Sequence, residues 1–239
     1  MGDQAPRESY PFWGYGDLAL FLGSLLPSIL ASAGVLLALR RIAPAAFASK
    51  AVETLSFQGL LYLFVVGALY VLVAARYRVP FASAFRLRSS FRRPWTLVFW
   101  GPVLAISISM LGVLLHAPMI PSPVDQMIAG RGSLILVAVF AVILAPIVEE
   151  LVFRGFLQPL FSKTLGAPAG ILICAALFGL MHGKQSQWAW QLILAISLAG
   201  AAFGYVRERT GSTAAAVALH AGYNATFFVA YVATHAGGA

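Results

Sequence analysis

Long apolar runs alternate along this chain with short segments that contain proline, glycine or charged residues. A helix needs about 20 mainly apolar residues to cross the hydrocarbon core of a bilayer. The pattern therefore predicts an all-α fold, a polytopic transmembrane helical bundle of about seven spans. We expect the spans at residues 18–39, 54–75, 95–116, 133–161, 167–182, 188–206 and 212–234.

The composition agrees with a membrane protein. Of the 239 residues, 60% are hydrophobic and only 10% are charged, whereas soluble domains contain about 25% charged residues. The spans use nearly the whole chain, so residues 1–239 are expected to form a single membrane domain. Cys174 is the only cysteine, which excludes an intrachain disulfide and a thiolate zinc cluster.

Basic residues in the loops predict the orientation, because short cytoplasmic loops accumulate Lys and Arg. The second loop is the most basic, and placing it inside predicts a cytoplasmic N-terminus and an external C-terminus. The first loop, with Arg40 and Arg41, favours the opposite orientation. The arginines of the second loop are Arg76, Arg78, Arg86, Arg88, Arg92 and Arg93.

The formal net charge of +8 raises the question of a nucleic-acid partner. The charge lies in short loops next to the spans, where contact with anionic membrane lipid explains it better. We therefore expect membrane lipid, and no nucleic acid, as a partner. Residues 1–17 lack a basic region followed by a small-residue cleavage site, so the first span is expected to be retained. Abundant Ala and Arg favour a bacterial cell membrane.

Two adjacent carboxylates and an arginine interrupt the apolar run APIVEELVFRGF, residues 145–156. Glu150 and Arg154 lie one helical turn apart, which favours an ion pair, while Glu149 points elsewhere and is a candidate general base. Pro146 lacks an N–H group and predicts a kink just before the pair. Alternatively, the charges mark the solvated end of a helix that emerges into the cytoplasm.

Two histidines also lie in apolar predicted helices. Phe178 and His182 are four residues apart, as are His220 and Asn224, so each pair shares one helix face. Counting about 1.5 Å per residue from the predicted turns places these side chains and Glu149 at similar depths. Three antiparallel helices are therefore expected to gather them around one cavity, although each histidine alone is also compatible with a packing role.

In this order and spacing, the three motifs resemble those of the CAAX-prenyl-protease and bacteriocin-processing family, also called CPBP or Abi. The resemblance covers residues 133–230, the expected catalytic core, and implies an intramembrane glutamic endopeptidase. By analogy, Glu149 assisted by His182 would activate water, and His220 with Asn224 would stabilise the oxyanion. Glu150, Arg154 and Phe178 would support these groups.

The resemblance also implies a membrane-associated or lipidated protein or peptide as substrate, with a prenylated one left open. No metal ligand is predicted, because the chain has no HExxH motif and the two histidines lie on different helices. Zinc or another divalent metal remains the alternative, since histidine and glutamate are zinc ligands.

Two other classes of function remain open. The polar side chains could form only a buried network in a non-catalytic membrane immunity or binding protein of the Abi type. A proton-coupled transporter could use Glu149 as a relay, although the chain has no internal repeat.

Residues 14–17 read GYGD, the form of the GxGD motif of intramembrane aspartyl proteases. That chemistry needs a second intramembrane aspartate, and the others, Asp3 and Asp125, lie outside the predicted spans. We instead expect an interfacial turn, with Trp13 and Tyr15 in an aromatic belt.

Overall fold

The computed structural model describes residues 10–87, 93–121, 127–128 and 131–235. Asp3, Asp125, Arg88 and Arg92, which entered the sequence interpretation, lie outside these residues. The helical elements are α1 (Tyr15–Ile42), η1 (Pro44–Phe47), α2 (Lys50–Leu69), η2 (Tyr70–Ala75), α3 (Phe81–Ala84), η3 (Pro94–Trp100), α4 (Gly101–Leu114), α5 (Arg131–Val139), η4 (Phe140–Leu144), α6 (Ala145–Glu150), η5 (Leu151–Leu157), α7 (Gln158–Leu165), α8 (Ala167–Met181), α9 (Trp190–Thr210) and α10 (Thr213–His235).

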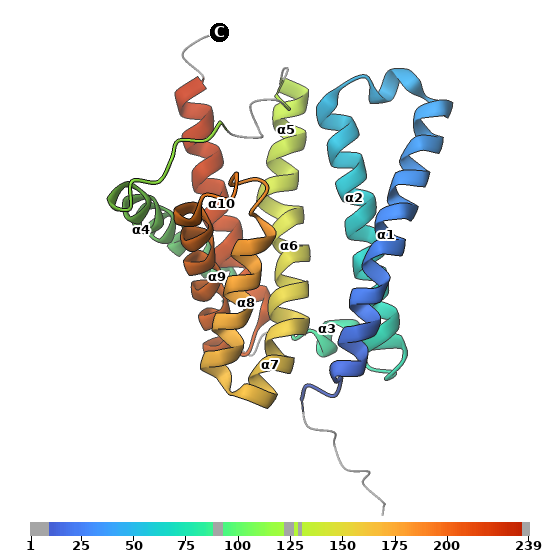
Figure 1. The fold of residues 1–239 in the computed structure, drawn as a ribbon, viewed down its shortest axis with the longest axis vertical. Helices are drawn as coiled ribbons and strands as arrows, with labels where there is room; N and C mark the ends of the chain where they lie inside the picture. Colours follow the sequence, from blue (N-terminus) through green and yellow to red (C-terminus); the bar gives the residue numbers. More distant parts are fainter. Residues whose placement is uncertain (1–9, 88–92, 122–126, 129–130, 236–239) are drawn as a thin grey trace, which may run out of the picture.

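The predicted helical bundle is confirmed, and no strand occurs in the described part of the chain. Six helices there are long and apolar enough to cross a membrane, and the elements from α5 to α7 join into one of them. The remaining predicted span, residues 167–182, corresponds to α8, which has only 15 residues. It is about 22 Å long, shorter than a hydrocarbon core of roughly 30 Å, so the turn that follows it lies within the bundle's height (Figure 1).

The helices run up and down, which gives the bundle two ends (Figure 1). The amino-terminal end carries the start of α1, the short helix α3, and the α7–α8 and α9–α10 turns. The carboxy-terminal end carries the α1–α2 turn, the start of α5 and the end of α10. The second loop, which contains α3, and the start of α1 were predicted to lie on one side of the membrane, and they do lie at one end of the bundle.

The segment before α1 is packed into the amino-terminal end. Trp13 is 1% exposed, stacks on Phe156, and donates its indole N–H to the Phe156 carbonyl at 3.1 Å. The expectation that Trp13 lies in an interfacial belt is therefore wrong, because the bundle offers this ring an apolar pocket with a hydrogen-bond acceptor. Tyr15 is exposed, as expected.

The Asp17 carboxylate of the GYGD sequence stabilises the start of α1 at this end of the bundle. It accepts hydrogen bonds from the Gly14 N–H at 3.0 Å and the Tyr77 hydroxyl at 2.7 Å, and Arg76 lies 3.3 Å away. An acceptor in the first helical turn stabilises the helix start. Asp17 therefore has a structural role, as the sequence predicted.

Two glycines bring α10 against η3 and the start of α4. A Cβ atom on Gly222 would lie 2.0 Å from the Val98 carbonyl oxygen, and one on Gly101 would lie 2.1 Å from the Gly222 backbone. These are backbone collisions that no side-chain rotation relieves. Only glycine therefore permits this approach, which holds α10 in place.

We expect Gly222→Ala to lower the free energy of unfolding by about 1–3 kcal/mol, because the added methyl group forces the two helices apart. Thermal unfolding in detergent measures this. Gly112→Ala in α4 is the matched control, since its Cβ would meet its nearest neighbour at an ordinary 3.8 Å. Equal melting temperatures for the two variants would contradict the prediction.

Candidate active site

The helix that carries the two glutamates changes its backbone hydrogen-bonding pattern on both sides of them. The α-helical segment α6 lies between two π-helical segments, η4 and η5. In the π pattern, the N–H of residue 146 would donate to the Ala141 carbonyl, but Pro146 has no N–H group. The Asn224 amide from α10 donates to this carbonyl instead, at 2.8 Å. The Ala141 carbonyl, left without an N–H partner from Pro146, thus becomes a binding position for Asn224.

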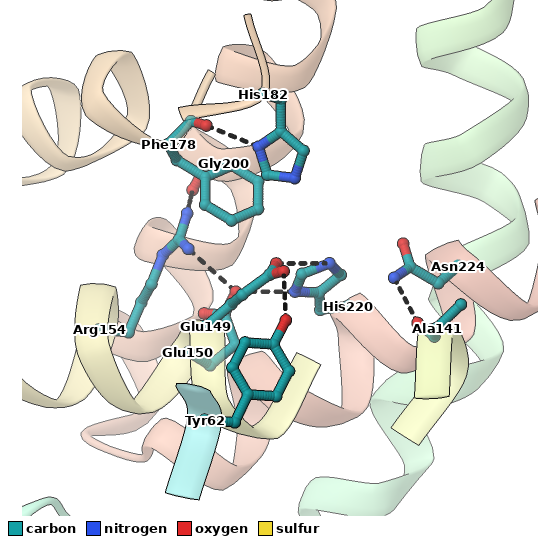
Figure 2. Close-up of polar contacts among 10 residues, drawn as sticks. All are labelled: Tyr62, Ala141, Glu149, Glu150, Arg154, Phe178, His182, Gly200, His220 and Asn224. Carbon is teal, nitrogen blue, oxygen red and sulfur yellow. Dashed lines mark hydrogen bonds and ion pairs between the residues drawn. The ribbon is translucent and has the colours of Figure 1, made fainter. Parts of the chain in front are cut away.

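Glu150 is fully buried and held by two basic groups (Figure 2). Arg154 Nη1 lies 2.9 Å from Glu150 Oε1, as the one-turn spacing predicted. His220 Nδ1 from α10 lies 2.9 Å from the same oxygen. A buried carboxylate needs such partners, because an uncompensated charge in an apolar interior is costly. Glu150 therefore links the η5 helix to α10.

Arg154 is also fully buried and binds α9. Its Nη2 donates to the Gly200 carbonyl at 2.5 Å, and its guanidinium lies 4.8 Å from the centre of the Phe178 ring. One turn further on, Gln158 Nε2 donates to the Gly204 carbonyl at 3.0 Å. The small residues Gly200 and Gly204 therefore form a packing seam within the bundle, where the absence of a side chain lets the neighbouring helix approach closely.

Glu149 faces another direction from Glu150. Its side chain is 15% exposed, and its Oε2 lies 3.9 Å from His220 Nε2. The Tyr62 hydroxyl from α2 donates to Glu149 Oε1 over a long 3.4 Å. Neither contact neutralises Glu149 in the way that Arg154 neutralises Glu150. The two neighbouring carboxylates therefore have different environments, as general acid–base chemistry requires.

Each histidine is fixed by an aromatic contact. The His220 ring stacks on Phe203, with centroids 4.4 Å apart and planes at 17°. His182 ends α8, where its Nδ1 lies 2.8 Å from the Phe178 carbonyl. The two rings flank Phe178, at centroid distances of 4.7 Å for His182 and 5.7 Å for His220.

The four predicted catalytic side chains line one cavity of about 380 Å³. Glu149, His182, His220 and Asn224 reach it from three different helical segments. The remainder of the wall is mostly aromatic or aliphatic. A cavity with a few convergent polar groups in an apolar wall is typical of a binding or active site.

Sequence reasoning missed two contributors to this arrangement. Tyr62 lies 87 residues before Glu149 and outside the expected catalytic core, so no local spacing relates the two. Phe203 looked like any other apolar residue of a span, although it sets the plane of the His220 ring. Neither residue carries a signal that is visible without the packed bundle.

Part of this chain, including the residues that line the cavity, is similar to a known protein family. The model of the family described as type II CAAX prenyl endopeptidase, Rce1-like, matches residues 131–226. Residues 131–226 form an Rce1-like segment. This segment contains all seven residues of the three motifs, and the family resemblance stated from those motifs is confirmed. No curated protein and no solved structure matches the chain.

The Rce1-like segment supports a protease of the CAAX type that acts on a protein substrate in a membrane environment. The six span-length helices make the chain an integral membrane protein. A purely structural network or a transporter has no comparable support from the family match.

Proposed function

We propose that this chain is an intramembrane glutamic endopeptidase, which hydrolyses a peptide bond of a membrane-associated or lipidated protein. The observation that carries the proposal is the asymmetry of the two glutamates. Glu150 is neutralised by Arg154 and His220, whereas Glu149 lines the cavity with no arginine or lysine within ion-pair distance among the described residues. A carboxylate in such a poorly solvated site is suited to act as a general base.

In this mechanism Glu149 takes a proton from a water molecule, which then attacks the carbonyl carbon of the substrate. His182 assists from the end of α8, where Nδ1 is bound to a backbone carbonyl and leaves Nε2 for the cavity. Glu149 later returns the proton to the leaving nitrogen. Each transfer needs the donor and the acceptor within hydrogen-bond reach in the substrate complex.

Asn224 and His220 are the proposed oxyanion donors. An amide NH₂ group has two N–H donors, and Asn224 uses one for the Ala141 carbonyl. The other can reach into the cavity. His220 holds Nδ1 against Glu150 Oε1 at 2.9 Å, which turns Nε2 toward the Glu149 side of the cavity, 3.9 Å from Glu149 Oε2. Each oriented donor is worth about 3–4 kcal/mol in the transition state.

We propose that the reaction needs no metal ion. His220 faces a carboxylate with each ring nitrogen, and His182 Nδ1 faces a backbone carbonyl, so both imidazoles have other partners. Within the described part of the chain, no three side chains of His, Cys, Asp and Glu are gathered as metal ligands. Zinc sites use at least three protein ligands.

Activity is therefore expected to persist after treatment with a chelator. Cleavage by the purified protein is measured before and after dialysis against EDTA, with metal content checked by elemental analysis. Activity that vanishes with EDTA and returns with zinc would reverse the proposal in favour of a metalloprotease.

The experiment that tests the function compares new peptide termini in membranes and medium, by mass spectrometry. One set of cells carries the wild-type protein, and the other carries Glu149→Gln at the same abundance. Termini that depend on Glu149 support an endopeptidase and show whether the substrate is prenylated. Identical termini, with Glu149→Gln still complementing a deletion phenotype, would favour a non-catalytic binding or immunity protein.

A further inference from the structure

The proposed base, Glu149, is contacted by a helix that lies outside the Rce1-like segment. That segment covers residues 131–226, whereas α2 ends at Leu69. The Tyr62 hydroxyl of α2 donates to Glu149 Oε1 at 3.4 Å, and the other carboxylate oxygen, Oε2, faces His220 Nε2 at 3.9 Å (Figure 2). Tyr62 therefore binds one oxygen of the carboxylate and leaves the other facing His220.

The position of the Tyr62 hydroxyl is fixed through its ring. The ring stacks on Phe140, with centroids 5.8 Å apart and planes at 19°. Phe140 precedes Glu149 on the same span-length helix. It also packs on the α2 backbone one turn before Tyr62, where a Cβ atom on Gly59 would lie 3.7 Å from its ring. The contact between α2 and the helix of the glutamates therefore sets where the hydroxyl meets Glu149.

Tyr62 holds Glu149 from outside the cavity. The described residues that line the cavity include Glu149 but not Tyr62. A carboxylate can turn about its side-chain bonds, and a general base works only when it is held within reach of its proton. Neighbours that lock the side chain of a catalytic group supply this support. Contacts of this kind are often long in the free enzyme and shorten in the substrate complex, which agrees with the 3.4 Å distance.

We propose that Tyr62 is a positioning residue for Glu149. Its hydroxyl binds Oε1 and so holds Oε2 toward His220, where Oε2 takes the proton from the attacking water. The inference rests on the proposed protease function and deepens it. Because Tyr62 lies outside the cavity wall, it acts through Glu149 and touches no substrate. The working site therefore extends beyond the Rce1-like segment to α2.

Tyr62→Phe tests the role, because it removes only the hydroxyl and keeps the ring on Phe140. We expect kcat for peptide cleavage to fall about tenfold, since a hydrogen bond to a charged group is lost. KM and the melting temperature should stay at the wild-type values. Tyr70→Phe is the matched control, because Tyr70 belongs to the same span and is exposed. An unchanged kcat in Tyr62→Phe, or a loss that comes with a lower melting temperature, would overturn the proposal.

The double variant Tyr62→Phe with Glu149→Gln shows which group Tyr62 acts on. If the hydroxyl works through the base, its removal should cause no further loss once the base is gone. The residual cleavage of the double variant should therefore equal that of Glu149→Gln alone. A further loss as large as the one in the wild-type background would place the effect on another group, and would contradict the inference.

A readout without catalysis separates this inference from the protease proposal. The probe is dicyclohexylcarbodiimide, an apolar reagent that bonds to carboxyl oxygens, and mass spectrometry follows its attachment to Glu149 in the full-length protein. We expect attachment to be several-fold faster in Tyr62→Phe, because Oε1 is then released from its donor. Glu53, a partner of Arg40, should react equally in both proteins.

Equal rates at Glu149 in Tyr62→Phe and in the wild type would overturn the inference, whether or not the chain is a protease. A failed protease proposal would appear differently. Peptide termini would then be the same in wild-type and Glu149→Gln cells, while the reagent still distinguished Tyr62→Phe from the wild type.

Discussion

Glu149→Gln is expected to lower kcat/KM for peptide cleavage by about 10²–10⁴-fold, the usual contribution of a positioned general base. Glutamine keeps the size of the side chain and a carbonyl oxygen that can still accept from the Tyr62 hydroxyl. It cannot accept a proton from water. The loss is therefore expected in kcat, with little change in KM.

The purified variant is assayed against a peptide taken from the termini that depend on Glu149, and its melting temperature is compared with that of the wild type. Glu53→Gln is the matched control, because Glu53 is a half-exposed partner of Arg40 far from the cavity. It should cleave at the wild-type rate. Full activity in Glu149→Gln would remove the assigned base, and loss of both activity and folding would show that Glu149 is structural.

Arg154→Met is expected to have the largest effect on stability, lowering the free energy of unfolding by about 3–5 kcal/mol. That range is typical when one partner of a buried ion pair is removed. Glu150, 0% exposed, would lose its strongest partner, and the Gly200 carbonyl would lose its donor. Methionine has a similar length, so the cost reflects the uncompensated charge more than a cavity. Thermal unfolding in detergent measures the loss.

The double variant Glu150→Leu with Arg154→Met separates charge from packing. With no charge left unpaired, stability is expected to recover most of the loss, because apolar replacements of buried ion pairs are often neutral or stabilising. Cleavage should stay low, since His220 would lose the Glu150 acceptor that orients its ring. A double variant as unstable as Arg154→Met would show that the ion pair itself is not the source of the loss.

The sequence by itself determined the all-helical membrane fold. A helix needs about 20 apolar residues to cross the hydrocarbon core, and runs of that length can be seen directly in the chain. The sequence also predicted the Glu150–Arg154 pair, since residues four apart on a helix are neighbours on one face. It also predicted that Glu149, His182, His220 and Asn224 lie near one another, because counting residues from the turns places them at similar depths. All four line one cavity, while their catalytic roles stay predictions.

The tertiary structure decided the contacts between helices that no spacing encodes. Tyr62 meets Glu149, His220 meets Glu150, and Trp13 enters the core, each across 70 or more residues of chain. The reason is that a span's hydropathy specifies its depth but neither its neighbour nor its rotation. Those are set by close packing, through contacts such as the Gly222 backbone against Val98, and by the donors and acceptors that each buried polar group must find.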